Sequence, residues 1–193
     1  MQRRSFLLAG SAAVLAAGCA EDKPRFKSVD ITGADYAKDF PLPDVEGRMR
    51  GIQDFKGKAV GVFFGFTQYP DVCPTTLGEI AQAKKLLGPD GDKVVGVLVT
   101  VDPERDKPEL LKAYVANFGT DFVALRGSAE QTAAVAKDFE VFYKKADLKS
   151  GGYTMEHSAA SYVYDPQGRL RLYSRYGSGA QALADDLKLL LRG

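Results

Sequence analysis

The sequence predicts an α/β fold with a central mixed β-sheet, and two patterns support this prediction. The first is the alternation of short apolar runs with stretches of helical spacing, beginning at residues 59–66, "AVGVFFGF". Such alternation is typical of a parallel sheet covered by helices on both faces. The second is residues 160–176, "ASYVYDPQGRLRLYSRY", which have the pattern of an antiparallel hairpin.

Three apolar runs predict strands that are buried on both faces of a sheet. They are residues 59–66, 94–101 and 122–125. Ahead of the first run, residues 39–60 mix glycines with isolated apolar side chains and predict a short hairpin. Near the C-terminus, residues 165–168 read Asp-Pro-Gln-Gly, which is good turn chemistry between the two strands of the closing hairpin.

Four segments have the spacing of amphipathic helices. They cover residues 76–87, 109–119, 128–139 and 180–191. Thr76 and Glu79 have the spacing of a capping box, as do Ser128 and Gln131, so helices are expected to begin near Thr76 and near Ser128. The resulting order of elements favours a thioredoxin-like fold with an inserted strand–helix unit.

Composition limits the classes of partner. The chain has 193 residues, which suits one domain and a leader, and 45% of its residues are hydrophobic. Lys and Arg number 26 against 25 Asp and Glu, so the formal net charge of +1 is too small to attract the protein to nucleic acid. We therefore expect no nucleic-acid partner.

The N-terminus predicts export and membrane attachment. Two arginines precede a short apolar run in "MQRRSFLLAGSAAVLAAGCAED", which indicates a signal peptide of twin-arginine-like, lipoprotein type over residues 1–18. Cys19 would be lipidated, residues 19–39 would form the tether and residues 40–193 the domain. The protein is then expected in the bacterial cell envelope, on the extracytoplasmic face of a membrane. An ordinary signal peptide with an incidental Cys19 is the alternative.

The second cysteine of the chain, Cys73, is the candidate reactive group. If Cys19 carries lipid, Cys73 is the single thiol of the exported domain, and no internal disulfide is expected. Cys73 lies between the first buried strand and its helix, at the sheet edge where α/β proteins place their sites. A helix N-terminus also stabilises a thiolate. The alternative is a small buried apolar residue with no chemical role.

The single histidine of the chain, His157, directly precedes the closing hairpin. In thioredoxin-like folds that segment faces the turn that carries the cysteine, so fold analogy would bring Cys73 and His157 together. A thiolate and a neutral imidazole suit copper or zinc. A surface position or a hydrogen-bonded core position is the alternative for His157.

Four long motifs resemble those of the Sco/SenC family, and the match covers most of Phe40 to Gly193. They are "FKGKAVGVFFGFT", "PDVCPTTL", "VTVDPERDKPELLKAY" and "EHSAASYVYDPQGRL". The resemblance implies a thioredoxin-like domain that binds copper and helps to assemble the binuclear copper centre of cytochrome c oxidase. A respiratory oxidase subunit or another copper protein is the implied partner.

The resemblance also implies a ligand set. The family binds copper with two cysteines in a C-x-x-x-C motif and a distant histidine, and these positions fall on Tyr69, Cys73 and His157. A phenol is a poor ligand for Cu(I), which prefers sulfur, so a weakened Cu(I) site is expected. Met155 is a possible substitute ligand, although packing is the favoured interpretation. Asp102 is expected to tune the site through its neighbours, or else to be a turn residue.

Three functions follow from these observations. The leading interpretation is a membrane-tethered copper-binding chaperone with a reduced ligand set, which is not an enzyme. The second is a thiol-disulfide oxidoreductase or peroxidase in which Cys73 is catalytic. The third is a relative that binds partners without metal or redox chemistry.

Overall fold

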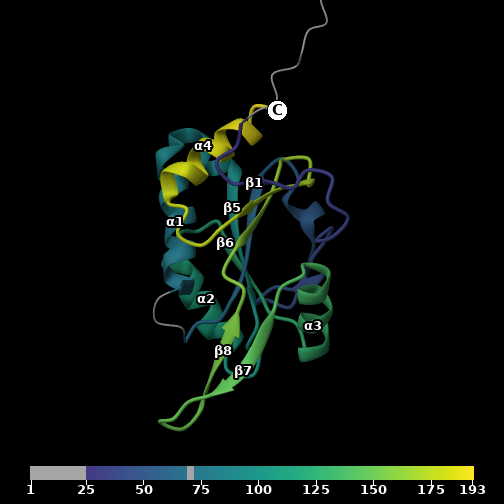
Figure 1. Ribbon diagram of the computed structural model, residues 1–193, viewed down its shortest axis with the longest axis vertical. Coiled ribbons are helices and arrows are strands. Elements are labelled where there is room, and N and C mark those ends of the chain that lie inside the picture. Colours follow the sequence, from purple (N-terminus) through teal and green to yellow (C-terminus); the bar gives the residue numbers. More distant parts are fainter. Residues whose placement is uncertain (1–24, 69–71) are drawn as a thin grey trace, which may run out of the picture.

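The computed structural model describes residues 25–68 and 72–193, without the side chains of Val72 and Cys73. A six-stranded sheet with the order β1-β10-β9-β4-β5-β6 forms the centre of the molecule (Figure 1). Its strands are β1 (Val29–Asp30), β4 (Ala59–Gly65), β5 (Val94–Thr100), β6 (Phe122–Leu125), β9 (Ser161–Tyr164) and β10 (Leu170–Ser174).

The sheet is mixed, as the sequence predicts. Strands β4, β5 and β6 are parallel, and β9 pairs with β4 in the antiparallel direction, with Ser161 opposite Phe63 and Tyr164 opposite Val60. Every residue of β4 and β5 is buried, which explains their continuous apolar sequences. The hairpin of β9 and β10 turns at Gly168, whose φ of 77° favours glycine.

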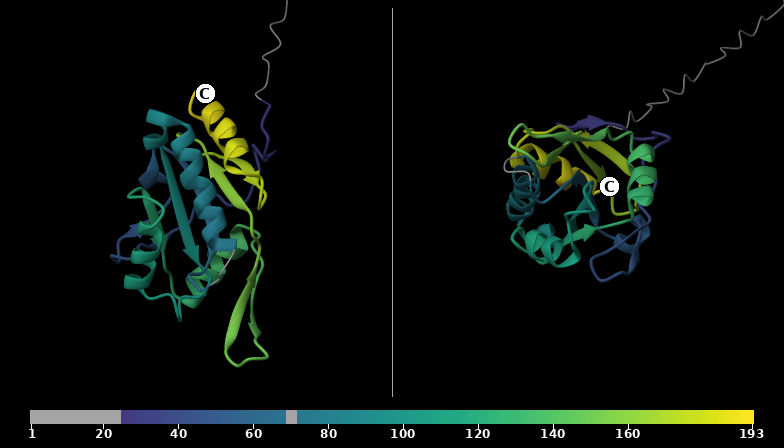
Figure 2. Two further views of the ribbon diagram at one scale, coloured as in Figure 1. Left: turned by 90° about the vertical axis from the view of Figure 1, so that its left-hand side faces the viewer. Right: turned by 90° about the horizontal axis from the view of Figure 1, so that it is seen from below.

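Helices cover both faces of the sheet (Figures 1 and 2). They are α1 (Val72–Leu86), α2 (Pro108–Ala116), α3 (Ala129–Asp138) and α4 (Ala180–Leu190), with two 3-10 helices, η1 (Ile52–Phe55) and η2 (Gly88–Lys93). Residues of α1, α2 and α4 share one apolar cluster with one face of the sheet, whereas α3 packs into the cluster on the other face. The interior therefore consists of two apolar layers separated by the sheet.

Two helix starts can be compared with the sequence. The capping box of Ser128 and Gln131 is present at the start of α3, as predicted. The expected start near Thr76 is wrong, because α1 already begins at Val72. Pro74 then lies in the first helical turn, where proline is tolerated because backbone N–H groups there have no intrahelical partner.

Two small hairpins complete the fold. Strands β2 (Leu42–Pro43) and β3 (Met49–Arg50) form the short hairpin expected ahead of β4. Strands β7 (Tyr143–Asp147) and β8 (Tyr153–His157) form a second hairpin that the sequence did not predict. This hairpin projects from the end of the molecule opposite to α4 (Figures 1 and 2).

The N-terminal part of the described chain packs on the domain. Strand β1 pairs with β10, and the buried carboxylate of Asp186 in α4 accepts the backbone N–H groups of Lys27 and Ser28 at 2.6 and 2.8 Å. The folded domain therefore begins further towards the N-terminus than the expected boundary at residue 40. Among the described residues, no helix is both long enough and apolar enough to cross a membrane.

Candidate metal centre

The backbone places Cys73 at the edge of the sheet that the sequence predicts. Strand β4 ends at Gly65, and the chain then leads into α1, of which Cys73 is the second residue. The start of this helix thus lies at the C-terminal end of the parallel strands, where ligands bind in open α/β sheets. The predicted positions Tyr69 and Cys19 lie outside the described residues.

His157 is the last residue of β8 and lies at the same edge of the sheet. Its ring packs against Phe63 in β4, at 5.8 Å between ring centroids, and against Phe66, at 5.9 Å. Both contacts are close to perpendicular. Because Phe66 follows β4 directly, the imidazole lies beside the start of the connection that leads to Cys73. The structure therefore brings these two sequence-predicted residues to one edge.

The hydrogen bond of the imidazole selects its tautomer. His157 Nδ1 lies 2.9 Å from the carbonyl oxygen of Ser158. A carbonyl oxygen only accepts, so Nδ1 carries the proton and Nε2 is the basic nitrogen of the neutral ring. Burial lowers the pKa of His157, partly opposed by this hydrogen bond. The neutral ring that results is the form that binds metals.

Met155 lies on the same face of β8 as His157, because side chains two residues apart in a strand point the same way. It is only 6% exposed and belongs to the apolar cluster on the α3 side of the sheet. It also lines a cavity of about 120 Å³, together with Tyr143 and Tyr153. These surroundings are those of a core methionine.

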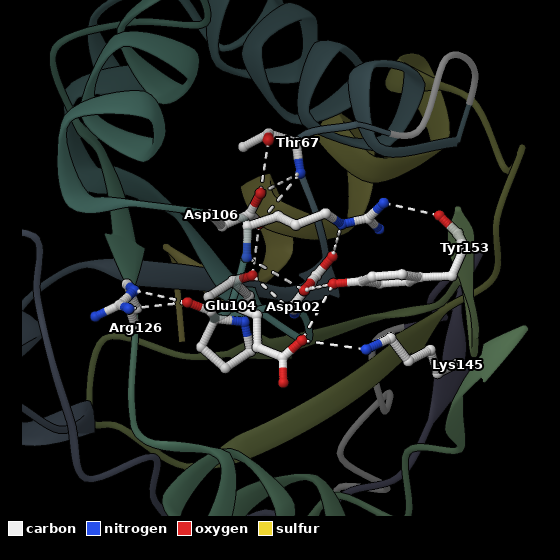
Figure 3. A network of polar contacts seen from close by, with 10 residues as sticks. Thr67, Asp102, Glu104, Asp106, Arg126, Lys145 and Tyr153 are labelled. Carbon is white, nitrogen blue, oxygen red and sulfur yellow. Dashed lines mark hydrogen bonds and ion pairs between the residues drawn. The ribbon is translucent and has the colours of Figure 1, made fainter. Parts of the chain in front are cut away.

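Asp102 follows β5 and forms part of a polar network rather than an exposed turn (Figure 3). Its carboxylate is buried, forms a salt bridge with Arg105 and accepts the hydroxyl of Tyr153 at 3.0 Å. Arg105 in turn donates from Nη1 to the carbonyl oxygen of Tyr153 at 2.7 Å. The segment after β5 is thereby attached to β8, the strand that ends at His157.

Two cations lie against the ring of Tyr153. The Cζ atom of Arg105 is 3.7 Å from the ring centroid, and Nζ of Lys145 is 3.8 Å from it. Lys145 also forms a salt bridge with Glu104 at 3.1 Å, which adds a second link between the hairpin and the segment after β5 (Figure 3). Burial, followed by the hydrogen bond to Asp102, raises the pKa of Tyr153, so the phenol stays protonated and donates.

Asp106 holds the connection between β4 and α1. It is fully buried and accepts the hydroxyls of Thr67 and Thr100, each at 2.6 Å, and the backbone N–H of Thr67 at 3.2 Å (Figure 3). Burial raises its pKa in spite of these donors. Thr67 belongs to the connection between β4 and α1, so Asp106 anchors the start of the segment that leads to Cys73.

Sequence reasoning missed Asp106, Arg105 and Tyr153. Each of the three makes a hydrogen bond to a residue at least 39 positions away in the chain, and local spacing does not reveal such contacts. The available signal was the density of charged residues in "VDPERD" directly after a buried strand, at the edge where sites form. Among the side chains that the structure describes, no three His, Cys, Asp or Glu residues are grouped to hold a metal.

Comparison with known proteins identifies the family. A family model described as SCO1/SenC matches residues 29–192. The chain belongs to the SCO1/SenC family. A SCO2-like protein of Rickettsia prowazekii is 36% identical over 132 residues, which cover 67% of this chain and 64% of that relative. The chain therefore spans slightly less than two thirds of the length of this SCO1/SenC relative.

Solved structures show the same fold. ScoI of Bradyrhizobium japonicum, solved with copper bound, is 38% identical and superposes with a TM-score of 0.70 over 79% of this chain and 97% of that one. A SCO1/SenC family lipoprotein of Bacillus anthracis is 28% identical, with a TM-score of 0.65 over 79% of this chain and 92% of that one. The thioredoxin-like fold predicted from the sequence is confirmed for this SCO1/SenC protein.

Proposed function

We propose that this SCO1/SenC protein binds copper through Cys73 and His157 and hands it on during assembly of a respiratory cytochrome c oxidase. The observation that carries the proposal is the place of His157. Its ring lies beside Phe66, on the connection that leads to Cys73, and the bond from Nδ1 makes Nε2 the basic nitrogen. A neutral imidazole and a thiolate suit Cu(I). The copper-bound relative from Bradyrhizobium supports copper as the cargo.

The ligand set of this chain is a reduced one. Tyr69 stands where the resemblance to the family places the first cysteine, and a phenol is a hard, mostly protonated donor. Cu(I) accepts low coordination numbers but prefers sulfur, so binding through Cys73 and His157 would be weaker than binding through three ligands. A weakly held metal suits a protein that must give its cargo up.

Attachment to a membrane through a lipid on Cys19 is part of the same proposal. The sequence around Cys19 resembles a lipoprotein signal, and the SCO1/SenC relative from Bacillus anthracis is described as a lipoprotein. Strand β1 and the hairpin β7–β8 lie towards opposite ends of the domain (Figure 1). An N-terminal anchor would therefore leave the end that carries His157 facing away from the membrane. Mass spectrometry of the mature N-terminus tests this part, and an unlipidated Cys19 contradicts it.

A Cu(I) titration of the full chain tests the copper proposal. Competition with a chromophoric Cu(I) chelator, without oxygen, should give one copper per wild-type chain and no binding in Cys73→Ser or His157→Ala. Tyr69→Cys should restore a third ligand and tighten binding at least about tenfold, or about 1.4 kcal/mol.

A matched control separates a restored ligand from an added thiol. Leu86→Cys introduces an exposed cysteine at the far end of α1, away from the site, and should leave the affinity unchanged. If neither the wild type nor Tyr69→Cys binds copper, the proposal fails and a metal-free role in partner binding replaces it. If Cys73 instead forms mixed disulfides or reduces peroxide without copper, the thiol-redox function replaces it.

A further inference from the structure

We propose that residues 102–106 form a bracket that fixes the Cys73 segment relative to His157, with Asp106, Arg105 and Tyr153 as positioning residues. The proposal rests on the proposed function, since it concerns the same two ligands. It goes further because it couples the position of the connection that leads to Cys73 to the position of β8, which ends at His157.

The first side of the bracket holds the connection from β4 to α1. Asp106 accepts both the N–H and the hydroxyl of Thr67, so it fixes the backbone and the side chain at the start of this connection. The carboxylate is fully buried, which excludes competing water. Hydrogen bonds to a buried carboxylate are charge-assisted or, when it is protonated, still directional, and they define one geometry.

The second side holds β8. Arg105 binds the backbone carbonyl of Tyr153 and stacks on its ring, while Asp102 accepts the hydroxyl of Tyr153. These attachments matter because β7 and β8 form a sheet of only two strands, separate from the central sheet. An isolated two-stranded hairpin is marginally stable in water. The position of His157 at the end of β8 therefore depends on contacts with the bracket.

The two sides are joined within a very short segment. Asp106 donates its backbone N–H to the carbonyl oxygen of Asp102 at 3.0 Å, which closes a tight turn. Thr100 connects the two aspartates, because its hydroxyl donates to Asp106 and accepts the backbone N–H of Asp102 at 3.0 Å. A displacement of one aspartate must therefore move the other or break one of these bonds.

Arg105 also reaches the aromatic residues beside the site. Its Cζ atom lies 5.7 Å from the centroid of Phe66, the ring that contacts His157 at 5.9 Å. Its Nη2 atom is buried and has no hydrogen-bond partner among the described residues. An unsatisfied buried donor is unfavourable, and such groups in native structures call for an explanation. The close contact of the guanidinium with the Tyr153 ring supplies one, since it holds Arg105 in this place.

The test is a cross-effect in the metal-free, full-length protein. Tyr153→Phe removes one hydroxyl on the His157 side, and Asp106→Asn weakens the acceptor on the Cys73 side. For each variant we would measure the labelling rate of Cys73, assigned by mass spectrometry, and the NMR shifts of the His157 ring. Tyr153→Phe should change the labelling rate about threefold or more, as expected within one coupled network. Asp106→Asn should shift the His157 signals.

Two control variants make the same chemical changes outside the bracket. Tyr36→Phe removes a phenol beside Gly168, in the turn between β9 and β10 at the end of the sheet opposite to His157. Asp165→Asn alters a buried aspartate at the opposite end of β9, where it binds backbone N–H groups and arginines. Both controls should leave the two readouts as in the wild type. If Asp106→Asn does not fold, Thr67→Val removes the hydroxyl from the same bond.

The outcomes separate the bracket from the proposed function. The bracket is overturned if Tyr153→Phe leaves the labelling rate of Cys73 unchanged and Asp106→Asn leaves the His157 signals unchanged. This holds even when the wild type binds copper. Cross-effects in a wild type that binds no copper would leave the bracket standing and refute the copper function. When both hold, the Cu(I) affinities of Tyr153→Phe, Asp106→Asn and the double variant should be non-additive, because both changes loosen one assembly.

Discussion

Met155 offers a direct choice between core packing and copper ligation. Its side chain is 6% exposed and lies in the apolar cluster on the α3 side of the sheet. We predict that it acts through packing alone. Met155→Leu preserves most of the volume and removes the thioether sulfur, so it separates the two roles, whereas Met155→Ala removes both the volume and the sulfur.

The expected magnitudes follow from the burial of this side chain. Truncating a buried methionine to alanine costs about 2–5 kcal/mol of stability, whereas a swap that conserves volume costs less than about 1.5 kcal/mol. Losing a metal ligand should weaken copper binding by at least about tenfold, or about 1.4 kcal/mol. Under packing alone, Met155→Leu should leave the copper affinity within about threefold of the wild type, which is well below one tenfold step.

The assay combines urea unfolding of the metal-free protein with the Cu(I) competition titration. Unfolding shows whether each variant keeps its fold, and the titration is then interpreted only for folded protein. Our reasoning is refuted if Met155→Leu is as stable as expected but binds copper at least about tenfold more weakly. That result would make the thioether the third ligand in place of the residue at position 69.

Two further predictions concern stability. Burial lowers the pKa of His157 in the folded protein below its usual 6.5. As the pH falls, His157 of the unfolded chain is therefore protonated before His157 of the folded chain. The stability of the metal-free protein should then fall as the pH drops from 6.5 towards the folded pKa. With one histidine in the chain, His157→Gln should abolish that slope in pH-dependent unfolding, and an unchanged slope would contradict it. The hydroxyl of Thr132, in a side chain 1% exposed, has no partner among the described residues, so Thr132→Val should raise the unfolding free energy by about 1 kcal/mol. A loss of stability in thermal or urea unfolding would show that the hydroxyl is satisfied.

The sequence was sufficient for the central sheet because burial on both faces leaves a strong pattern. The runs that form β4 and β5 are apolar throughout, and the turn between β9 and β10 has proline and glycine where a turn needs them. The hairpin β7–β8 has no such pattern. The residues of β7 are partly or fully exposed. The hairpin is held by contacts with the segment after β5, which is distant from it in sequence.

The candidate site was predictable in part. Cys73 and His157 are rare residue types at positions that the order of elements brings together, so the sequence pointed to both. The roles of Asp106 and Arg105 depend on a hydrogen bond to Thr67 and on stacking against Tyr153. Charged residues in a turn are usually solvated. Only the three-dimensional arrangement shows that Asp106 is buried and that Arg105 is half-buried.

The order of strands in the sheet has a consequence for the time at which the protein can fold. Strand β4 needs β9 as a partner, and the amide of Lys27 binds Asp186, 159 residues further along the chain. At about 5–20 residues per second, the ribosome needs about 8–30 s to supply that partner. Contacts this distant in sequence also fold slowly. The domain therefore cannot be completed before the segment that contains Asp186 has been synthesised. Such late folding suits the twin-arginine-like signal predicted for residues 1–18, because that export route carries chains that are already folded.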